Sequence, residues 1–190
     1  NSGAESWEAT LKFCRKWGNT THAKPKNRLL AFNDSFHGRT YGAISTTGQP
    51  KYHKGFEPLL PGIDFADFND LASVEKALTD ETCAILVEPL QAEGGIHAAT
   101  PEFLQGLRDL CDEREMLLVF DEIQVGCGRL GSLWAHQQYG VEPDIMTLAK
   151  ALGGGLPIGV ALLRQKVADA IQAGDHAATF GANPVACAAA

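Results

Sequence analysis

Five short, mostly apolar runs along this chain are bounded by polar residues, glycine or proline. Runs of this length without regular polar alternation are typical of strands buried on both faces of a parallel sheet. The pattern therefore predicts strands over residues 28–32, 83–87, 116–120, 144–149 and 160–163.

Between these runs, apolar residues recur three or four positions apart, which predicts helices with one buried face. The first helix starts near Ser6 and buries Trp7, Leu11 and Cys14. Because strands and helices alternate, the sequence predicts an α/β fold with a mostly parallel sheet. Further helices are predicted over residues 71–78, 100–111 and 167–171, the second of them starting with the capping sequence Thr-Pro-Glu. The stretch 46–62 is rich in turn residues and is predicted to be a long surface loop.

Composition narrows the class of protein. The 190 residues, 45% of them hydrophobic, are enough for one sizeable core. A net charge of −7 without a Lys/Arg cluster argues against a nucleic-acid or anionic-membrane partner, because either would require a basic surface. No apolar stretch approaches the ~20 residues that cross a bilayer. We expect a cytoplasmic protein, with organellar targeting left open because the chain does not begin with methionine.

The cysteines are odd in number and have no C-x-x-C spacing. We therefore expect reduced thiols within the core, and no disulfide framework, metal site or redox pair. The five are Cys14, Cys83, Cys111, Cys127 and Cys187.

Two of the predicted strands end in side chains of opposite charge. The run 116–120 leads to Asp121, and the run 144–149 leads to Lys150, shortly before three glycines. Ligands lie at the carboxyl ends of such strands. A partly desolvated lysine can form a Schiff base, and an aspartate can keep a pyridinium nitrogen protonated, so the pair points to pyridoxal phosphate (PLP). Taken singly, Lys150 fits a salt-bridged lysine at a strand end, and Asp121 fits a helix cap or a metal ligand.

Two further segments carry candidate binding residues. The small residues 1–4 precede a helix and can offer free backbone amides to an anion such as phosphate. After the strand 28–32, Phe36 offers a ring for stacking and Arg39 a guanidinium that can grip a carboxylate. In isolation, an ordinary helix cap, a core phenylalanine and a solvated arginine explain the same residues.

A pair of acids follows the strand 83–87. Glu88 and Glu93 could serve a metal ion, but no histidine lies at ligand spacing, and His97 is expected at the surface. No metal site is predicted.

Six motifs cover essentially the whole chain in a fixed order. They are Asn-Ser-Gly, Phe-His-Gly-Arg-Thr, Val-Glu-Pro-Leu-Gln-x-Glu-Gly-Gly, Phe-Asp-Glu-Ile-Gln, Leu-Ala-Lys-Ala-Leu-Gly-Gly-Gly and Thr-Phe-Gly-x-Asn-Pro. Together they resemble the class III (ornithine-type) aminotransferases of PLP fold type I. The resemblance implies PLP as cofactor and a doubly wound α/β/α sandwich. It also implies that residues 1–190 are an interior part of the PLP-binding large domain, without its N-terminal segment and without the C-terminal small domain.

The resemblance assigns catalytic roles to two residues. Lys150 would form the Schiff base with PLP and, once displaced by substrate, move the proton between the substrate carbon and the cofactor. Asp121 would pair with the pyridine nitrogen, so that the ring can act as an electron sink.

Other residues would hold the cofactor. Gln124 would hydrogen-bond the phenolic oxygen, and Phe36 would stack on the ring. The amides of Gly3 and Ala4 would hold the phosphate, helped by Thr179 from the other subunit of a homodimer that shares its active sites.

Substrate recognition follows from the same resemblance. Arg39 would bind the α-carboxylate of the donor, and Glu93 would be a gating acid that pairs with a second arginine beyond Ala190. We expect transfer of the terminal amine of N2-acetylornithine to 2-oxoglutarate, giving N-acetylglutamate 5-semialdehyde and glutamate in arginine biosynthesis. The alternatives are ornithine, succinylornithine, 4-aminobutyrate or lysine-pathway donors, and more remotely an aminomutase on the same fold or a non-enzymatic binding module.

Some positions depart from the family pattern. Ala92 and Ala182 stand where glycine is usual, and Ala177 and Ala178 replace Gly-Ser. An added methyl group disfavours positive φ, so we expect shifted loops wherever the family backbone is left-handed.

Overall fold

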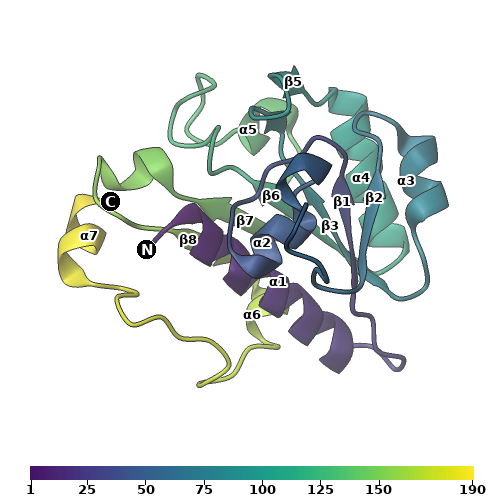
Figure 1. Ribbon diagram of the computed structural model, residues 1–190, viewed down its shortest axis with the longest axis horizontal. Helices are drawn as coiled ribbons and strands as arrows, with labels where there is room; N and C mark the ends of the chain where they lie inside the picture. Colours follow the sequence, from purple (N-terminus) through teal and green to yellow (C-terminus); the bar gives the residue numbers. More distant parts are fainter.

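The computed structural model describes all 190 residues, in which helices and strands alternate along the chain (Figure 1). The strands are β1 (Arg28–Phe32), β2 (Ile63–Ala66), β3 (Thr82–Val87), β4 (Leu90–Gln91), β5 (His97–Ala98), β6 (Leu117–Asp121), β7 (Ile145–Leu148) and β8 (Val160–Leu163). The helices are α1 (Gly3–Thr20), α2 (Tyr41–Thr46), α3 (Leu71–Ala77), α4 (Pro101–Glu113), α5 (His136–Tyr139), α6 (Gln165–Ala168) and α7 (Pro184–Ala189), with 3₁₀ turns η1 (Pro50–Tyr52) and η2 (Lys150–Gly153).

Six strands form one sheet in the order β2-β1-β3-β6-β7-β8. All neighbours are parallel except β7 and β8, which are antiparallel. The chain moves outward from β1 to β2 and then returns to the other side of β1 with β3. The parallel strands have their carboxyl ends at one edge of the sheet, and in open α/β sheets ligands bind there, at the point where the strand order reverses.

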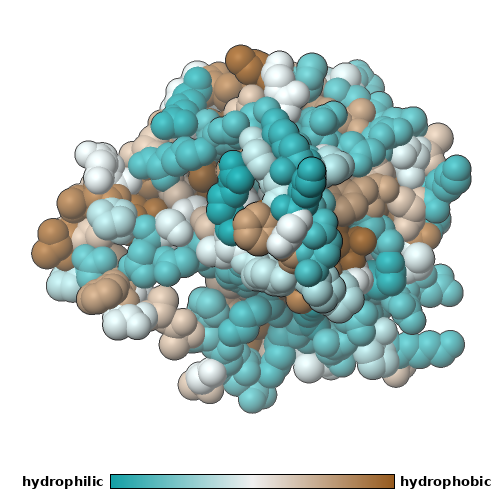
Figure 2. Space-filling model, viewed as in Figure 1, coloured by the Kyte–Doolittle hydropathy of each residue, from teal (hydrophilic) through white to brown (hydrophobic).

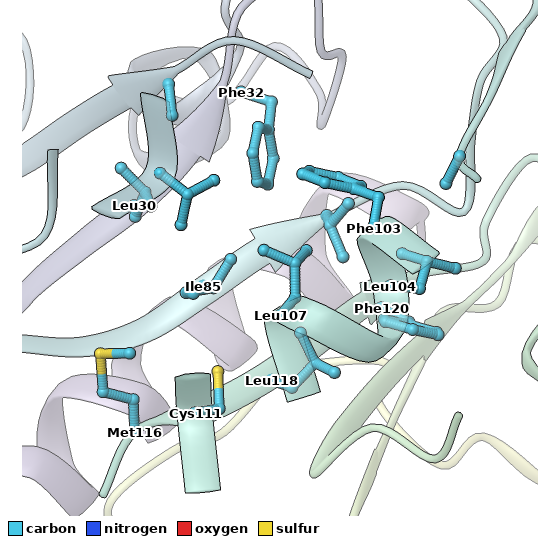
Figure 3. Close-up of a cluster of buried hydrophobic side chains, with 14 of the residues drawn as sticks. Leu30, Phe32, Ile85, Phe103, Leu104, Leu107, Cys111, Met116, Leu118 and Phe120 are labelled. Carbon is cyan, nitrogen blue, oxygen red and sulfur yellow. The ribbon is translucent and has the colours of Figure 1, made fainter. Parts of the chain in front are cut away.

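Each face of the sheet is covered by a separate apolar cluster. Successive residues of a strand point to opposite faces, so Leu30 and Ile85 face α3 and α4, while Leu29 and Leu86 face α1 and α6. Burying one such side chain stabilises the fold by roughly 1.5–3 kcal/mol. Figure 3 shows the first cluster, in which Phe103, Leu104, Leu107 and Cys111 of α4 pack on Ile85, Leu118 and Phe120. The sandwich with a mostly parallel sheet is therefore confirmed.

Most predicted elements are confirmed to within a few residues. The helix start at Thr100 is one: the Thr100 Oγ1 accepts a hydrogen bond of 3.1 Å from the Phe103 amide, and Pro101 is the first helical residue. The predicted strand 116–120 is β6, one residue further along, and the predicted helix 167–171 is the earlier α6. His97 is exposed, as expected.

Two predictions were wrong. Residues 46–62 are not one surface loop, because Thr46, Thr47 and Gln49 are buried and η1 follows them. The proline and glycine content marks turns correctly but does not reveal that Thr47 and Gln49 bond to the backbone after β1. Cys187 is exposed on α7, whereas Cys14, Cys83 and Cys111 are buried as expected, and all five thiols are free.

No helix in the structure is both long enough and apolar enough to cross a membrane.

Candidate active site

A cavity of about 320 Å³ opens at the carboxyl edge of the sheet, between the start of α1 and the residues that follow β1, β6 and β7. Its lining brings together residues that are far apart in the sequence. They are Asn1, Ser2, Gly3, Ala4, Phe36, His37, Gly38, Asp121, Ile123, Gln124, Ala149, Lys150, Gly155, Leu156, Pro157 and Ile158.

Lys150 lies two residues after the end of β7 and has a positive φ of 44°. Its Nζ donates a hydrogen bond of 2.6 Å to Gln124 Oε1 across the cavity. Burial lowers the pKa of Lys150 below its ordinary value, while the charge of Asp121 acts in the opposite direction. A lysine amine with a lowered pKa is a better nucleophile at neutral pH.

Asp121 ends β6 and is almost completely buried. Its Oδ2 lies 2.7 Å from His37 Nδ1, and its Oδ1 accepts hydrogen bonds from the Ile123 amide and the Thr147 hydroxyl, at 3.1 and 3.3 Å. These partners hold the carboxylate at the cavity wall in one orientation.

His37 is the residue in this site that the sequence reasoning did not assign. Its ring is fully buried and stacks on Trp7, with centroids 3.9 Å apart and planes 7° from parallel. Trp7 is fixed in turn, because its Nε1 donates to Thr46 Oγ1 at 2.8 Å. The only available signal was the position of His37 beside Phe36 after a buried strand.

The start of α1 forms the opposite wall. Ser2 caps the helix, with its Oγ accepting from the Glu5 amide at 3.2 Å, and the next residues, Gly3 and Ala4, line the cavity. Free amides and the positive end of the helix dipole therefore face the hollow, as an anion such as phosphate requires. An added Cβ on Gly3 would lie 3.0 Å from Ile123.

Gln124 and Phe36 complete the lining. Gln124 Oε1 is occupied by Lys150, but Gln124 Nε2 is buried without a hydrogen-bond partner. A buried donor of this kind costs free energy unless a ligand accepts from it. The half-buried Phe36 is followed by His37 and Gly38, which also line the cavity.

Three predicted site residues lie outside the lining. Arg39 is exposed, next to the lining residue Gly38. Glu93 is exposed in the turn between β4 and β5, near enough for its charge to raise the pKa of Lys150. Thr179 is exposed and lines a different hollow, beside Glu5 and Glu8 of α1.

The alanine departures behave differently from one another. Ala182 has a φ of 57°, so its backbone is in the left-handed region that favours glycine. Ala92 is not in that region; in the β4–β5 turn the non-glycine residue with a positive φ is Ile96, at 62°.

Two further buried acids shape the site. Glu88 Oε2 accepts a hydrogen bond of 3.0 Å from the Phe36 amide, and burial followed by the charge of Asp121 raises the pKa of Glu88 well above its ordinary range. Glu122 accepts from the amides of Ala135 and His136 at 2.6 and 2.8 Å, so it caps the start of α5.

No group of three or more His, Cys, Asp or Glu side chains is arranged to hold a metal ion.

The chain belongs to the class-III aminotransferase family, which it matches over residues 1–190. It is 49% identical over 190 residues to the acetylornithine aminotransferase of Methanocaldococcus jannaschii, covering 100% of this chain and 48% of that protein. It is 54% identical over 196 aligned residues to the succinylornithine transaminase of Yersinia pseudotuberculosis, covering 100% of this chain and 47% of that protein.

Solved structures agree with this family. The ornithine aminotransferase of Toxoplasma gondii superposes with a TM-score of 0.94 at 37% identity, covering 100% of this chain and 46% of that one. The N-acetylornithine aminotransferase of Stenotrophomonas maltophilia superposes with a TM-score of 0.78 at 40% identity, covering 100% and 44%. The chain spans about half the length of the curated relatives it matches.

Proposed function

We propose that the full-length protein is a PLP-dependent aminotransferase that moves the terminal amine of N2-acetylornithine to 2-oxoglutarate. The observation that carries this proposal is that Lys150, Asp121 and Gln124 line one cavity together with the start of α1. The chemistry of these donors fits PLP: an amine with a lowered pKa, a fixed carboxylate, an unpartnered amide donor and an anion site.

The residues divide the work of the reaction. PLP, when bound, supplies a ring that withdraws electrons from the carbon next to the substrate nitrogen. Lys150 would hold the cofactor through its amine at rest and, once displaced by the substrate, would move the proton between that carbon and the cofactor. Asp121 would keep a proton on the pyridine nitrogen, and Gln124 would donate to the phenolic oxygen. The amides of Gly3 and Ala4 would bind the phosphate.

The names of the relatives indicate which amino donors to consider. Acetylornithine and succinylornithine differ only in the acyl group on the α-nitrogen, and both names occur among proteins about half identical to this chain. Succinylornithine is therefore the second candidate donor. Glu93, in the turn beyond Gln91, would leave a second arginine free when 2-oxoglutarate binds.

The test is turnover of the full-length protein with a panel of terminal-amine donors, with and without 2-oxoglutarate. We expect the highest kcat/KM for N2-acetylornithine, a strict need for the acceptor, and no turnover by Lys150→Ala. Turnover without any acceptor would favour an aminomutase, and substantial turnover by Lys150→Ala would refute the catalytic assignment.

We also propose that the full-length protein is a cytoplasmic homodimer that works in arginine biosynthesis. In this dimer, Thr179 would help to hold the PLP phosphate in the active site of the neighbouring subunit. Thr179 lies outside the cavity of its own chain, and Phe180 and Val185 nearby are 69% and 70% exposed. Brown, apolar atoms gather at the left edge of Figure 2, where Figure 1 has α7. Sedimentation of the full-length protein tests the dimer, and a Thr179→Ala variant with unchanged PLP affinity would contradict the shared site.

A further inference from the structure

Arg39 is a free cation held on an aromatic surface. No carboxylate lies within ion-pair distance of its guanidinium. The Arg39 Cζ instead lies 3.8 Å from the centre of the Tyr52 ring and 5.6 Å from the centre of the Phe36 ring. A guanidinium that rests on a ring face keeps its N–H edge available for a carboxylate.

Tyr52 is itself fixed relative to the cavity. Its ring meets Phe36 edge to face, with centroids 5.9 Å apart, and its amide donates to the Gln49 carbonyl at 2.9 Å. The buried Gln49 Nε2 donates to the Ser35 carbonyl at 3.2 Å, which ties η1 to the residues that follow β1. The Tyr52 ring on which Arg39 rests is therefore held to the same segment of the chain as Phe36.

The backbone on the other side of Arg39 is also held. Glu8 Oε1, on α1, accepts from the amides of Gly42 and Ala43 at 2.8 and 3.1 Å and so caps the start of α2. With the backbone anchored after Arg39 and the guanidinium placed on Tyr52, little freedom remains for the side chain. A cation held in position before binding loses less conformational entropy when it pairs with a carboxylate.

We propose that Tyr52 is a positioning residue that holds Arg39 ready for the carboxylate of the amino donor. This inference rests on the proposed function and adds a specificity role for a residue of η1. Because Tyr52 acts through Arg39, its removal weakens donor binding and leaves the chemical step largely intact.

The test compares Tyr52→Leu with Tyr52→Phe in the full-length holoenzyme. Tyr52→Leu should raise KM for N2-acetylornithine about three- to tenfold with little change in kcat, as expected for loss of a cation–π contact. Tyr52→Phe keeps the ring and should stay close to wild type. Calorimetric titration with N-acetyl-L-norvaline, which has the carboxylate but no terminal amine, should give a Kd raised by the same factor in Tyr52→Leu.

Two controls separate positioning from general damage. Lys51 Nζ lies 4.8 Å from the same ring, and Lys51→Gln should leave the kinetics unchanged. In an Arg39→Ala background, Tyr52→Leu should have no further effect on KM. An equal loss in that background, or a fall confined to kcat, would overturn the positioning role while leaving the proposed function standing. Failure of the wild type to turn over any donor with an α-carboxylate would overturn both.

Discussion

His37 Nδ1 lies 2.7 Å from Asp121 Oδ2, although the two residues are 84 positions apart in the sequence. An ionised carboxylate can only accept hydrogen bonds, so the proton of this contact belongs to the imidazole. His37 Nε2 is buried without a partner, and the ring is held by its stacking on Trp7, so Asp121 is its one hydrogen-bond partner through a ring nitrogen. The histidine therefore holds the carboxylate that faces the cavity.

Asp121→Asn should lower kcat on the order of 10²-fold or more, because an amide cannot stabilise a protonated pyridine nitrogen. His37→Phe keeps the stacking on Trp7 but removes the donor, so it should cause a smaller loss, roughly tenfold for a charge-assisted hydrogen bond. Steady-state kinetics and the Kd for PLP measure both effects. Near wild-type activity in Asp121→Asn would mean that the carboxylate is structural.

The reactivity of Lys150 should depend on pH in a defined direction. The amine attacks only when deprotonated, so the rate at which the apoprotein binds PLP covalently should rise with pH and level off below the ordinary lysine value of 10.5. Asp121 raises the pKa of Lys150, so Asp121→Asn should move the profile to lower pH. Stopped-flow absorbance gives the profile, and a midpoint at 10.5 or above would contradict the effect of burial.

Glu88 should make the protein less stable as pH rises. Its pKa is raised in the folded state, so its protonated form stabilises the fold below the unfolded value of about 4.5, and this contribution is lost as pH rises through the folded pKa. Glu88→Gln keeps an acceptor for the Phe36 amide without a charge. Its unfolding free energy relative to wild type should grow with pH, by at most about 1.4 kcal/mol per pH unit.

Urea unfolding between pH 5 and pH 8 measures this difference. The matched control is Glu75→Gln, which changes an exposed acid on α3 and should give a constant difference. A pH-independent difference for Glu88→Gln would mean that Glu88 is ionised in the folded protein.

Asp144 joins both faces of the sheet. The side chain is fully buried at the start of β7 and contacts Arg108 of α4 at 3.0 Å and Lys166 of α6 at 2.7 Å. Asp144→Asn removes the buried counter-charge of two cations, Arg108 and Lys166, and leaves Arg108 only its exposed partner, so it should cost about 3–5 kcal/mol of unfolding free energy. Asp112→Asn removes the exposed partner of the same arginine and should cost at most about 1 kcal/mol. Equal losses in urea unfolding would contradict the difference in burial.

The sequence predicts the parts of the site that depend on local signals. Lys150 and Asp121 each end a short apolar run, and parallel strands bring such ends to one edge, so their proximity follows from the pattern. Gly3 and Ala4 open a helix, which also is a local property.

The parts that were missed depend on contacts between distant segments. Trp7 shows as a core residue of an amphipathic helix, but its stacking on His37 depends on how α1 crosses the sheet. Tyr52 lies in a stretch that reads as exposed loop, because proline and glycine report turns and not burial. The buried Gln49 that anchors it finds its acceptor at Ser35, a pairing that no periodicity encodes.

The spacing of Ser2 and Glu8 along α1 fixes the distance between two parts of the structure. Ser2 caps the start of the helix, beside the cavity, and Glu8 accepts hydrogen bonds from the backbone that follows Arg39. With a rise of 1.5 Å per residue, the two attachment points are about 9 Å apart along the axis. One inserted residue between them would turn Glu8 by about 100° around the helix, away from α2. An insertion in this part of α1 would therefore separate the start of the helix from the segment of Arg39, whereas a substitution would keep the two in register.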